Sequence, residues 1–444
     1  MKRKQLIVVS FIGVLLFIFI AWKGSYIVNM PNLLVGFSAK VGCSLKYVTK
    51  LSNTQVREDL SVYSKWFNLV DMVFDENVQS VHSSLLWKKQ SATYRTGLGC
   101  TLENSDGINL NKLSIDSNLD EKKSNLSVQL DNNIMQQLEE IVHNDKLNGY
   151  DTRALLVLKN GNIVGEKYTN NFTKDTLFMG WSMSKTLTGI IIGNMIKNNL
   201  LDIDATPLFS EWRNTDKSKI TIKDLLTMTS GLSFSEKYEP GTDATRMLFN
   251  DVSSWKRAAN SKKKYNVGEY WSYSSGSTNI LSYLVYEKFS HNPEYLLAYI
   301  KKNILSPIGM NNTIVELDPS GSFVGSSFVL GSARDWAILG QFFLNSSSFN
   351  SGAIVEDDWI QQSTVPNTSQ NDDRFGYHIW LNTGKEREPR WSHLPDNTYA
   401  ARGSRGQVVL IIPELNTVIV RLGWSKKKYP INAFSHKVIK VIKS

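Results

Sequence analysis

A serine and a lysine separated by two residues, Ser182 and Lys185, carry the strongest chemical signal in the sequence. A serine hydroxyl is a poor nucleophile unless a neighbouring base takes its proton. If a helix opens at Ser182, the residue three positions on lies on the same face, so the Lys185 amine can reach the Ser182 oxygen. Backbone N–H groups at a helix start also point toward the charge that develops on a bound carbonyl. The pair therefore predicts a serine hydrolase with Ser182 as nucleophile and Lys185 as its activator.

The motif itself is short, and Ser-x-x-Lys arises by chance in most chains of this length, where the lysine is an exposed helix residue. Its position favours a catalytic role. A predicted hairpin precedes it, an apolar helix follows it, and Gly180-Trp181 forms a turn directly before the serine. For Lys185 to act as a base, burial must lower its pKa from about 10.4.

A second segment, from Trp271 to Ser275, places Tyr273 and Ser275 two residues apart. A tyrosine hydroxyl near an ammonium is biased toward phenolate, and it can relay a proton between nucleophile and leaving group. Ser275 could donate a hydrogen bond into the same pocket. Because the chain has 17 tyrosines, a packed loop tyrosine is the alternative, and only the serine–lysine pair favours the relay.

Glycines in a third segment, Ala400 to Gln407, would let a substrate backbone approach the start of a strand closely. The backbone N–H of Gln407 is predicted to be the second oxyanion donor, beside that of Ser182. Arg402 or Arg405 is predicted to hold a substrate carboxylate. A glycine-rich turn that leads into an edge strand is the alternative interpretation.

Other chemistries find less support. A lipase-type nucleophile elbow requires Gly-x-Ser-x-Gly, and Ser184 stands where the second glycine belongs. The sequence contains no H-E-x-x-H, phosphate-binding or dinucleotide-binding motif, so neither a metal nor an organic cofactor is predicted. The histidines are scattered along the chain: His82, His143, His291, His378, His393 and His436.

The elements that must position these residues are hairpins and helices. Asn160-Gly161 between apolar runs predicts a hairpin over residues 154–168, and residues 407–422 predict a second one. Between them, apolar residues recur at helical spacing. A helix is expected to open near Ser127, and Thr221 is expected to cap another. Hairpins at both ends of a helical middle predict an α+β fold, in which an antiparallel sheet is assembled from distant parts of the chain.

The first residues predict a membrane anchor. Three cations, Lys2 to Lys4, precede a charge-free, mostly apolar run from Leu6 to Trp22, which is at the short end of what spans a bilayer. The run lacks a small-x-small cleavage site, which favours an uncleaved anchor (residues 1–23) over a cleaved signal peptide. The positive-inside rule then exports everything after Lys23. The protein is predicted to be single-pass, with its catalytic domain periplasmic or at the cell surface.

If the chain is exported, Cys43 and Cys100, the two cysteines of the chain, lie in an oxidising compartment. An even number in an oxidising compartment predicts one disulfide, with two buried free thiols as the alternative. Both cysteines lie in a predicted extracytoplasmic extension, residues 24–125, which shows no clear periodicity and ends in a polar linker. Residues 126–444 are predicted to form the hydrolase domain.

The net charge of +9 implies some basic surface, but nucleic-acid binding would require clustered charge in a recognisable module. The runs Lys262–Lys264 and Lys426–Lys428 are typical of solvated turns. No nucleic-acid partner is predicted, and the excess charge is compatible with anionic lipid or cell-wall polymers.

From about Asp151 to the C-terminus the sequence resembles the β-lactamase-related serine hydrolases, which include class C β-lactamases, D,D-carboxypeptidases, esterases and 6-aminohexanoate-dimer hydrolases. The resemblance implies a β-lactamase/transpeptidase-like fold, with a helical subdomain inserted beside an antiparallel sheet flanked by helices. The two cysteine segments also look like those of a subgroup of exported members. Five segments in the family's order carry the resemblance: Gly180-Trp-Ser-Met-Ser-Lys185, Ile222-Lys-Asp-Leu-Leu-Thr-Met-Thr-Ser-Gly-Leu232, Trp271-Ser-Tyr-Ser-Ser275, Leu330-Gly-Ser-Ala-Arg-Asp335 and Gly403-Ser-Arg-Gly-Gln407.

The resemblance carries the family's nucleophile and lysine over to Ser182 and Lys185, and its Tyr-x-Asn or Tyr-x-Ser element to Tyr273 and Ser275. The family's third box is usually Lys-Thr-Gly or His-x-Gly, and Ser404-Arg405-Gly406 occupies that place here. The missing cation at position 404 speaks against efficient β-lactam hydrolysis and favours amidase or esterase activity.

The sequence therefore predicts an acyl-enzyme hydrolase for a small-molecule or peptide substrate with an amide or ester carbonyl. Either Lys185 or Tyr273 would be the general base. The alternatives are a β-lactamase or D,D-carboxypeptidase, and a membrane-tethered binding protein that keeps the fold without turnover.

Overall fold

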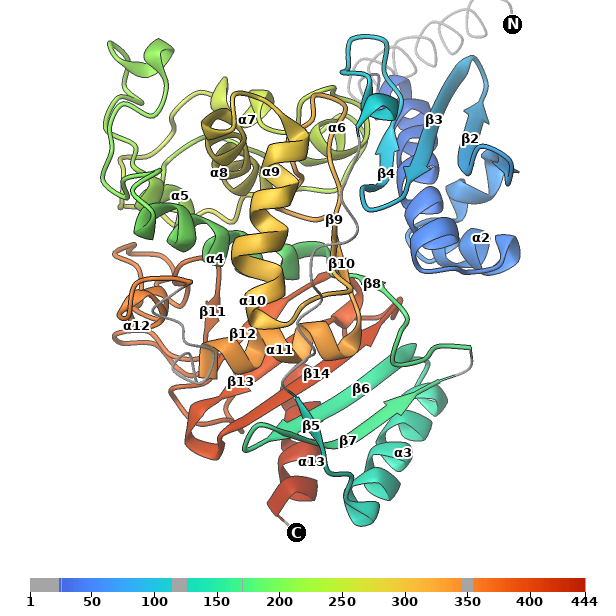
Figure 1. The fold of residues 1–444 in the computed structure, drawn as a ribbon, viewed down its shortest axis with the longest axis vertical. Helices are drawn as coiled ribbons and strands as arrows, with labels where there is room; N and C mark the ends of the chain where they lie inside the picture. The colour runs from blue at the N-terminus through green and yellow to red at the C-terminus, as the bar shows by residue number, and fades with distance from the viewer. Residues whose placement is uncertain (1–23, 25, 114–125, 170, 345–353, 444) are drawn as a thin grey trace, which may run out of the picture.

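A computed structural model of the chain describes residue 24 and residues 26–113, 126–169, 171–344 and 354–443. Its centre is a seven-stranded sheet in the order β11-β12-β13-β14-β6-β7-β5 (Figure 1). The strands of this sheet are β5 (Ser127–Val128), β6 (Thr152–Lys159), β7 (Asn162–Tyr168), β11 (Trp380–Leu381), β12 (Tyr399–Arg402), β13 (Val408–Ile412) and β14 (Thr417–Gly423).

Two hairpins from opposite ends of the hydrolase region meet in the middle of this sheet. β6 and β7 form one hairpin, and β13 and β14 form the other. β14 then pairs antiparallel with β6, from Thr417 opposite Lys159 to Gly423 opposite Thr152. Both predicted hairpins and the α+β class are confirmed.

Helices cover both faces of the sheet, which explains why β13 and β14 are buried along their whole length. α3 (Asn132–Leu147) and α13 (Ile431–Lys443) contribute to one core, at the bottom of Figure 1. α4 (Ser184–Lys197) and α11 (Ala333–Leu344) belong to the larger core on the other face. The larger core continues into the helices of the subdomain and therefore fixes the position of α4.

A helical subdomain lies above the sheet in Figure 1. A small sheet in the order β8-β10-β9 lies between this subdomain and the large sheet. The helices and strands of this region are α5 (Ile222–Leu226), α6 (Asp243–Phe249), α7 (Lys256–Ala259), α8 (Ser275–Lys288), α9 (Pro293–Ile300), α10 (Ser306–Ile308), α12 (Trp359–Ser363), β8 (Phe178–Met179), β9 (Ile314–Val315) and β10 (Val329–Gly331).

The prediction that a helix opens near Ser127 is wrong by several residues. Val128 lies in β5 and pairs with Ile163. Helix α3 begins after Asp131, whose carboxylate accepts hydrogen bonds from two backbone N–H groups of the first turn and is therefore the N-cap. The predicted cap at Thr221 is confirmed, with a complete capping box at the start of α5.

The stretch without clear periodicity contains a folded N-terminal unit, defined here as described residues 24–113. Its leading helix (residues 26–43) continues into a short π-helical turn. A four-stranded antiparallel meander follows, at the right of Figure 1. Its remaining helices and strands are α2 (Asn53–Ser61), η2 (Lys65–Leu69), β1 (Asp71–Asp75), β2 (Ser80–Leu85), β3 (Lys88–Arg95) and β4 (Gly99–Leu102).

Buried covalent and ionic contacts hold this unit together and attach it to the hydrolase region. Cys43 and Cys100 form the predicted disulfide, which ties the leading helix to β4. The Lys40 ammonium forms a fully buried ion pair with Glu316, a carboxylate that also accepts a hydrogen bond of 2.8 Å from the backbone N–H of Cys100. Because the carboxylate is almost completely removed from water, its partners must compensate its charge.

A second buried ion pair joins α2 to the central sheet. Both terminal nitrogens of the Arg153 guanidinium, on β6, donate to the carboxylate of Asp59, at 2.6 and 2.7 Å. The Trp424 indole N–H donates to the backbone oxygen of Asp59 at 2.8 Å. The N-terminal unit is thus fixed against the sheet at a second place.

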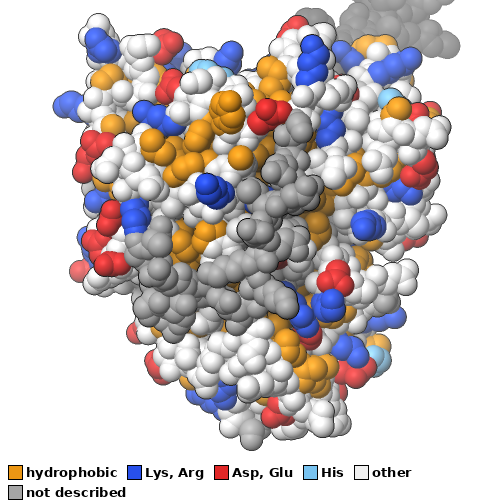
Figure 2. Space-filling model, viewed as in Figure 1, with side chains coloured by type: hydrophobic (Ala, Val, Ile, Leu, Met, Phe, Trp, Pro, Cys, Tyr) orange, Lys and Arg blue, Asp and Glu red, His pale blue; other side chains and the backbone are white. Residues whose placement is uncertain are grey.

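The predicted membrane anchor, residues 1–23, lies outside the described residues. Within the part of the chain that the structure describes, no helix combines the length and apolarity needed to cross a bilayer. On the face shown in Figure 2, basic side chains are interspersed with acidic ones.

We expect Lys40→Met to destabilise the protein by about 3 kcal/mol, because it leaves the Glu316 carboxylate buried without a counter-charge. The double variant Lys40→Met/Glu316→Gln should recover part of that loss, since no bare charge remains. Urea unfolding, followed by tryptophan fluorescence, measures both. A double variant no more stable than Lys40→Met would contradict this account.

Candidate active site

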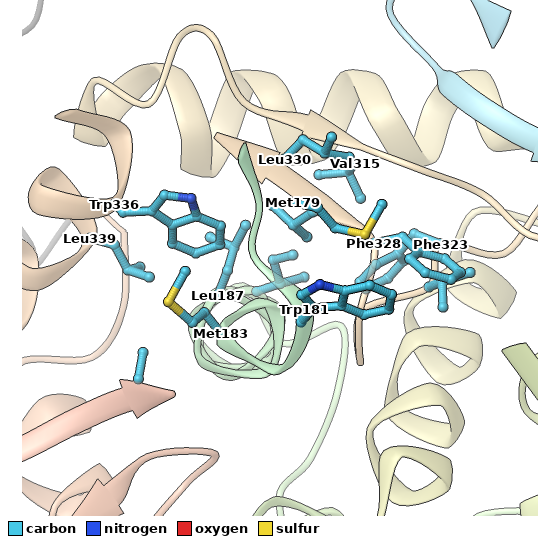
Figure 3. Close-up of a cluster of buried hydrophobic side chains, with 14 of the residues drawn as sticks. Met179, Trp181, Met183, Leu187, Val315, Phe323, Phe328, Leu330, Trp336 and Leu339 are labelled. Atoms are coloured by element: carbon cyan, nitrogen blue, oxygen red, sulfur yellow. The ribbon is translucent and has the colours of Figure 1, made fainter. Parts of the chain in front are cut away.

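The nucleophile turn connects β8 to α4 and presents Ser182 between two buried neighbours. Trp181 and Met183 are both almost inaccessible to solvent and lie in the hydrophobic cluster of Figure 3. Gly180 precedes them because a Cβ there would lie 2.3 Å from the Trp336 ring. Trp181 has a φ of 49°, a left-handed conformation that is rare for a bulky residue and is maintained here by its buried surroundings.

Lys185 lies beneath Ser182 and is almost completely buried. Its Nζ is 3.0 Å from Ser182 Oγ, 3.1 Å from Ser275 Oγ and 2.9 Å from the backbone oxygen of Ser326. Burial lowers the pKa of Lys185 to about 8, against the opposing charge of Glu236. The neutral amine, which can accept a proton, is therefore far more populated near neutral pH than for an ordinary lysine, and it becomes the main form above about pH 8.

Tyr273 closes the other side of the pair. Its ring lies 5.0 Å from Lys185 Nζ and stacks on Trp380, and Tyr273 lines the same cavity as Ser182. The expectation of a phenolate is wrong in direction. Burial and the Glu236 carboxylate raise the pKa of Tyr273 well above its usual value, so the side chain is a neutral phenol that can donate a proton.

Glu236 is a site residue that the sequence analysis missed. Its carboxylate accepts hydrogen bonds from the Ser275 backbone N–H at 2.7 Å and from Ser275 Oγ at 2.5 Å. Burial raises the pKa of Glu236 above its usual value, and the charge of Lys185 offsets only part of that rise. It lies in a loop after the Thr-Ser-Gly segment, where no periodicity or spacing identifies it.

Glu236 also changes the role of Ser275. The hydroxyl of Ser275 gives its single hydrogen to the carboxylate, so its oxygen accepts from Lys185. Ser275 therefore orients the lysine and does not donate a hydrogen bond into the pocket, contrary to the sequence-based expectation. A continuous chain of hydrogen bonds runs from Glu236 through Ser275 and Lys185 to Ser182.

The third segment is only partly where the sequence analysis expected it. Arg402, Gly403, Ser404 and Arg405 line the same pocket as Ser182. Gly403 is close to the nucleophile turn, since a Cβ on it would lie 2.4 Å from the Gly180 oxygen. The approach of these two backbones brings the start of the segment beside the nucleophile.

The structure does not bring Gln407 or Gly406 into this pocket. The Gln407 backbone N–H turns back to the Ser404 oxygen at 3.5 Å, and its side chain donates to the Met179 oxygen at 2.8 Å. Gly406 is close to Tyr429. Ser404 is the first residue of a single 3₁₀ turn, whose leading N–H has no acceptor within the turn, so Ser404 replaces Gln407 as the candidate second oxyanion donor.

The two arginines differ in their contacts. The Arg405 guanidinium lies 3.6 Å above the ring of Tyr63, in the N-terminal unit. The Arg402 guanidinium lies 5.1 Å from the Trp380 ring, and burial together with Arg390 lowers its pKa. Within the described ranges, neither arginine forms an ion pair with a carboxylate. Because Arg402 packs on Trp380, the ring that also stacks on Tyr273, it is the better candidate for an anionic substrate group.

These residues surround a cavity of about 690 Å³ that reaches from the nucleophile to the N-terminal unit. Ser182, Glu236, Tyr273 and Arg402 lie along its polar part. Among the described residues, no group of three histidine, cysteine, aspartate or glutamate side chains could hold a metal ion. The chemistry available here is nucleophilic attack with proton transfer by amine and phenol.

Comparison with known proteins gives a consistent result. The 6-aminohexanoate-dimer hydrolase of Paenarthrobacter ureafaciens is 22% identical over 296 residues, which cover 61% of this chain and 72% of that protein. A solved structure described as a 6-aminohexanoate-dimer hydrolase from Bacillus anthracis superposes with a TM-score of 0.59 at 20% identity, over 73% of this chain and 89% of that one. A class C β-lactamase mutant superposes with a TM-score of 0.53 at 14% identity, over 74% and 99%.

These likenesses agree with the fold, an antiparallel sheet flanked by helices. The family described as Beta-lactamase matches residues 144–433, which include each of the three segments around the cavity. The chain therefore belongs to the β-lactamase family of serine hydrolases.

Proposed function

We propose that this protein hydrolyses an amide or ester through an acyl-enzyme on Ser182. The observation that carries the proposal is the 3.0 Å contact between Ser182 Oγ and the buried Lys185 amine, whose pKa is lowered to about 8. An amine whose pKa lies near the working pH and that is within hydrogen-bond reach of a hydroxyl can serve as its general base. The similar proteins whose names specify amide hydrolysis support the same class of reaction.

The groups divide the steps between them. Lys185 takes the Ser182 proton as Oγ attacks the carbonyl, and the backbone N–H groups of Ser182 and Ser404 stabilise the oxyanion. Tyr273, a neutral phenol, protonates the leaving group and recovers its proton from the Lys185 ammonium. Water then attacks the ester and releases Ser182. Both Lys185 and Tyr273 thus participate, Lys185 as base and Tyr273 as acid.

A penicillin-recognising activity is the second candidate, because Arg402 is a half-buried cation in the pocket without an ion-pair partner among the described residues. Such a group suits the carboxylate of a β-lactam or of a cell-wall peptide. The absence of a cation at position 404 favours the amidase or esterase reaction over this one.

We also propose that residues 1–23 anchor the protein in a membrane, with the hydrolase region exported. The support is the order of charges and apolar residues in the sequence, together with a buried disulfide that suits an oxidising compartment.

Ser182→Ala should lower kcat on 4-nitrophenyl acetate by at least about 10³-fold and abolish labelling by a fluorophosphonate probe. Ser210→Ala, on an exposed serine, serves as the matched control and should retain both. Labelling by fluorescent penicillin, measured beside hydrolysis of a linear amide, separates the two candidate reactions. Undiminished probe labelling of Ser182→Ala would exclude Ser182 as the nucleophile.

The pH dependence of kcat/KM should show an acid limb near pH 8, because Lys185 must lose its proton before it can act as a base. Activity therefore rises as the pH increases through that value. Glu236→Gln removes the negative charge that stabilises the ammonium, so the limb should move to lower pH. The exposed Glu414→Gln is the control. A limb that stays in place in Glu236→Gln would show that the carboxylate does not act on Lys185.

Full-length protein should sediment with membranes and resist carbonate extraction, whereas a variant without residues 2–23 should be released. External protease added to intact cells or spheroplasts tests the side on which the hydrolase region lies. Recovery of the full-length protein in the soluble fraction would rule out the anchor.

A further inference from the structure

The active-site cavity has an apolar half that the family resemblance does not explain. The family match begins at residue 144, yet the cavity is also lined by residues of the N-terminal unit. The leading helix contributes Met30, Leu33 and Leu34, and the short helix η2 contributes Trp66 and Phe67. This wall is therefore supplied by residues that precede the matched family region.

The sequence of the leading helix suits this role. The residues that line the cavity, from Tyr26 to Phe37, recur at intervals of three and four, which places them on one face of a helix. The run from Ser25 to Ala39 contains no charged residue. The helix thus presents a continuous uncharged face to the cavity.

The wall is held in place by close contacts with the hydrolase region. A Cβ on Gly36 would lie 2.0 Å from the Phe249 oxygen, so the two backbones touch at that point. The Asn250 side-chain amide donates to the Asn32 oxygen at 2.9 Å. Phe37 packs on Phe249 with ring centroids 4.6 Å apart. A wall fixed in this way is preformed, so ligand binding does not carry the entropic cost of ordering it.

One side chain joins the apolar half to the catalytic turn. Phe37 stacks on Trp181, the residue directly before Ser182, with centroids 6.1 Å apart. Met30 and Leu33 are only half-buried, and Trp66 is 54% exposed near the mouth. Apolar area is thus left uncovered along a path that leads to the nucleophile. The charged residues of the lining, Glu236, Arg402 and Arg405, come from the hydrolase region, and Arg405 packs on Tyr63 of the N-terminal unit.

We propose that the substrate carries a long apolar chain, on the order of ten carbons given the size of the cavity, which lies along the wall of the leading helix. This inference rests on the proposed hydrolase function and specifies its substrate class as a lipophilic amide or ester. The leading helix and η2 are then specificity-determining elements, and the scissile amide or ester bond lies beside Ser182.

The test uses the full chain and two ester series. In 4-nitrophenyl alkanoates from acetate to dodecanoate the acyl side lengthens, and in alkyl 4-nitrobenzoates the leaving side lengthens. We expect kcat/KM to rise about threefold per methylene in one series over its middle range. Whichever series responds identifies the side of the scissile bond that faces the N-terminal unit. A flat response in both overturns the proposal.

Leu33→Gln should lower the ratio of kcat/KM for the decanoyl substrate to that for the acetyl substrate by about tenfold. Val28→Gln is the matched control, because Val28 lies on the same helix, is 64% exposed and does not line the cavity. The control should keep the wild-type ratio. Equal ratios in the two variants contradict a role of the leading helix in chain binding.

Binding to Ser182→Ala separates this inference from the catalytic proposal. Calorimetry should show that decanamide binds at least tenfold more tightly than acetamide, and that Leu33→Gln in the same background removes the difference. Chain binding without turnover or fluorophosphonate labelling of the wild type would refute the hydrolase proposal alone. Labelling and turnover without any preference for the longer amide would refute the apolar chain site alone.

Discussion

The removal of the Lys185 amine from water is the constraint on which the rest of the site depends. Its three hydrogen-bond partners, Ser182, Ser275 and Ser326, come from the nucleophile turn, the start of α8 and the segment before β10. Desolvation favours the neutral amine, and Glu236 favours the ammonium. Desolvation is the stronger influence, so the pKa of Lys185 is lowered to about 8, and the Glu236 charge limits the extent of that lowering. The inserted helices, the small sheet and the central sheet must all be correctly packed for these two effects to act on the pKa of Lys185.

The N-terminal unit lines the cavity and also contacts the segment that carries Ser326, a hydrogen-bond partner of Lys185. Ser326, which accepts a hydrogen bond from Lys185, lies in the segment between Glu316 and β10. The Glu316 backbone N–H donates to the Phe328 oxygen at 2.9 Å, and its carboxylate is held by Lys40, Ser44 and the N–H of Cys100. The N-terminal unit therefore supports the segment that orients the Lys185 amine. Loss of this unit is expected to impair catalysis.

The features that the sequence predicted well are those encoded by neighbouring residues. Ser182 and Lys185 share one helical turn, and the Asn160-Gly161 turn specifies its hairpin locally. The position of Tyr273 beside them followed from the order of family segments. Its protonation state did not, because burial, which raises its pKa, is a property of the whole fold.

Two of the errors originate in loop conformation. Glu236 lies in an irregular loop, and only tertiary structure brings it to Ser275. Gln407 was misplaced because Arg405 adopts a φ of 65°, which reverses the chain and turns the Gln407 N–H back onto the Ser404 oxygen. The N-terminal unit was read as irregular for a different reason, since its strands alternate poorly between buried and exposed residues.

The pairing of β14 with β6 has a consequence for how the protein is made. The turns of the two hairpins touch through Asn160 and Asn416, which are 256 residues apart in the chain. Until the last strands have been synthesised, β6 is an open edge with unsatisfied backbone groups, and closure of so long a loop is slow. A nascent or truncated chain therefore has no complete sheet on which to position α4, and catalytic competence arrives only when the C-terminal hairpin docks. The topology thus delays any hydrolytic activity until β13 and β14 have been synthesised and have paired with β6.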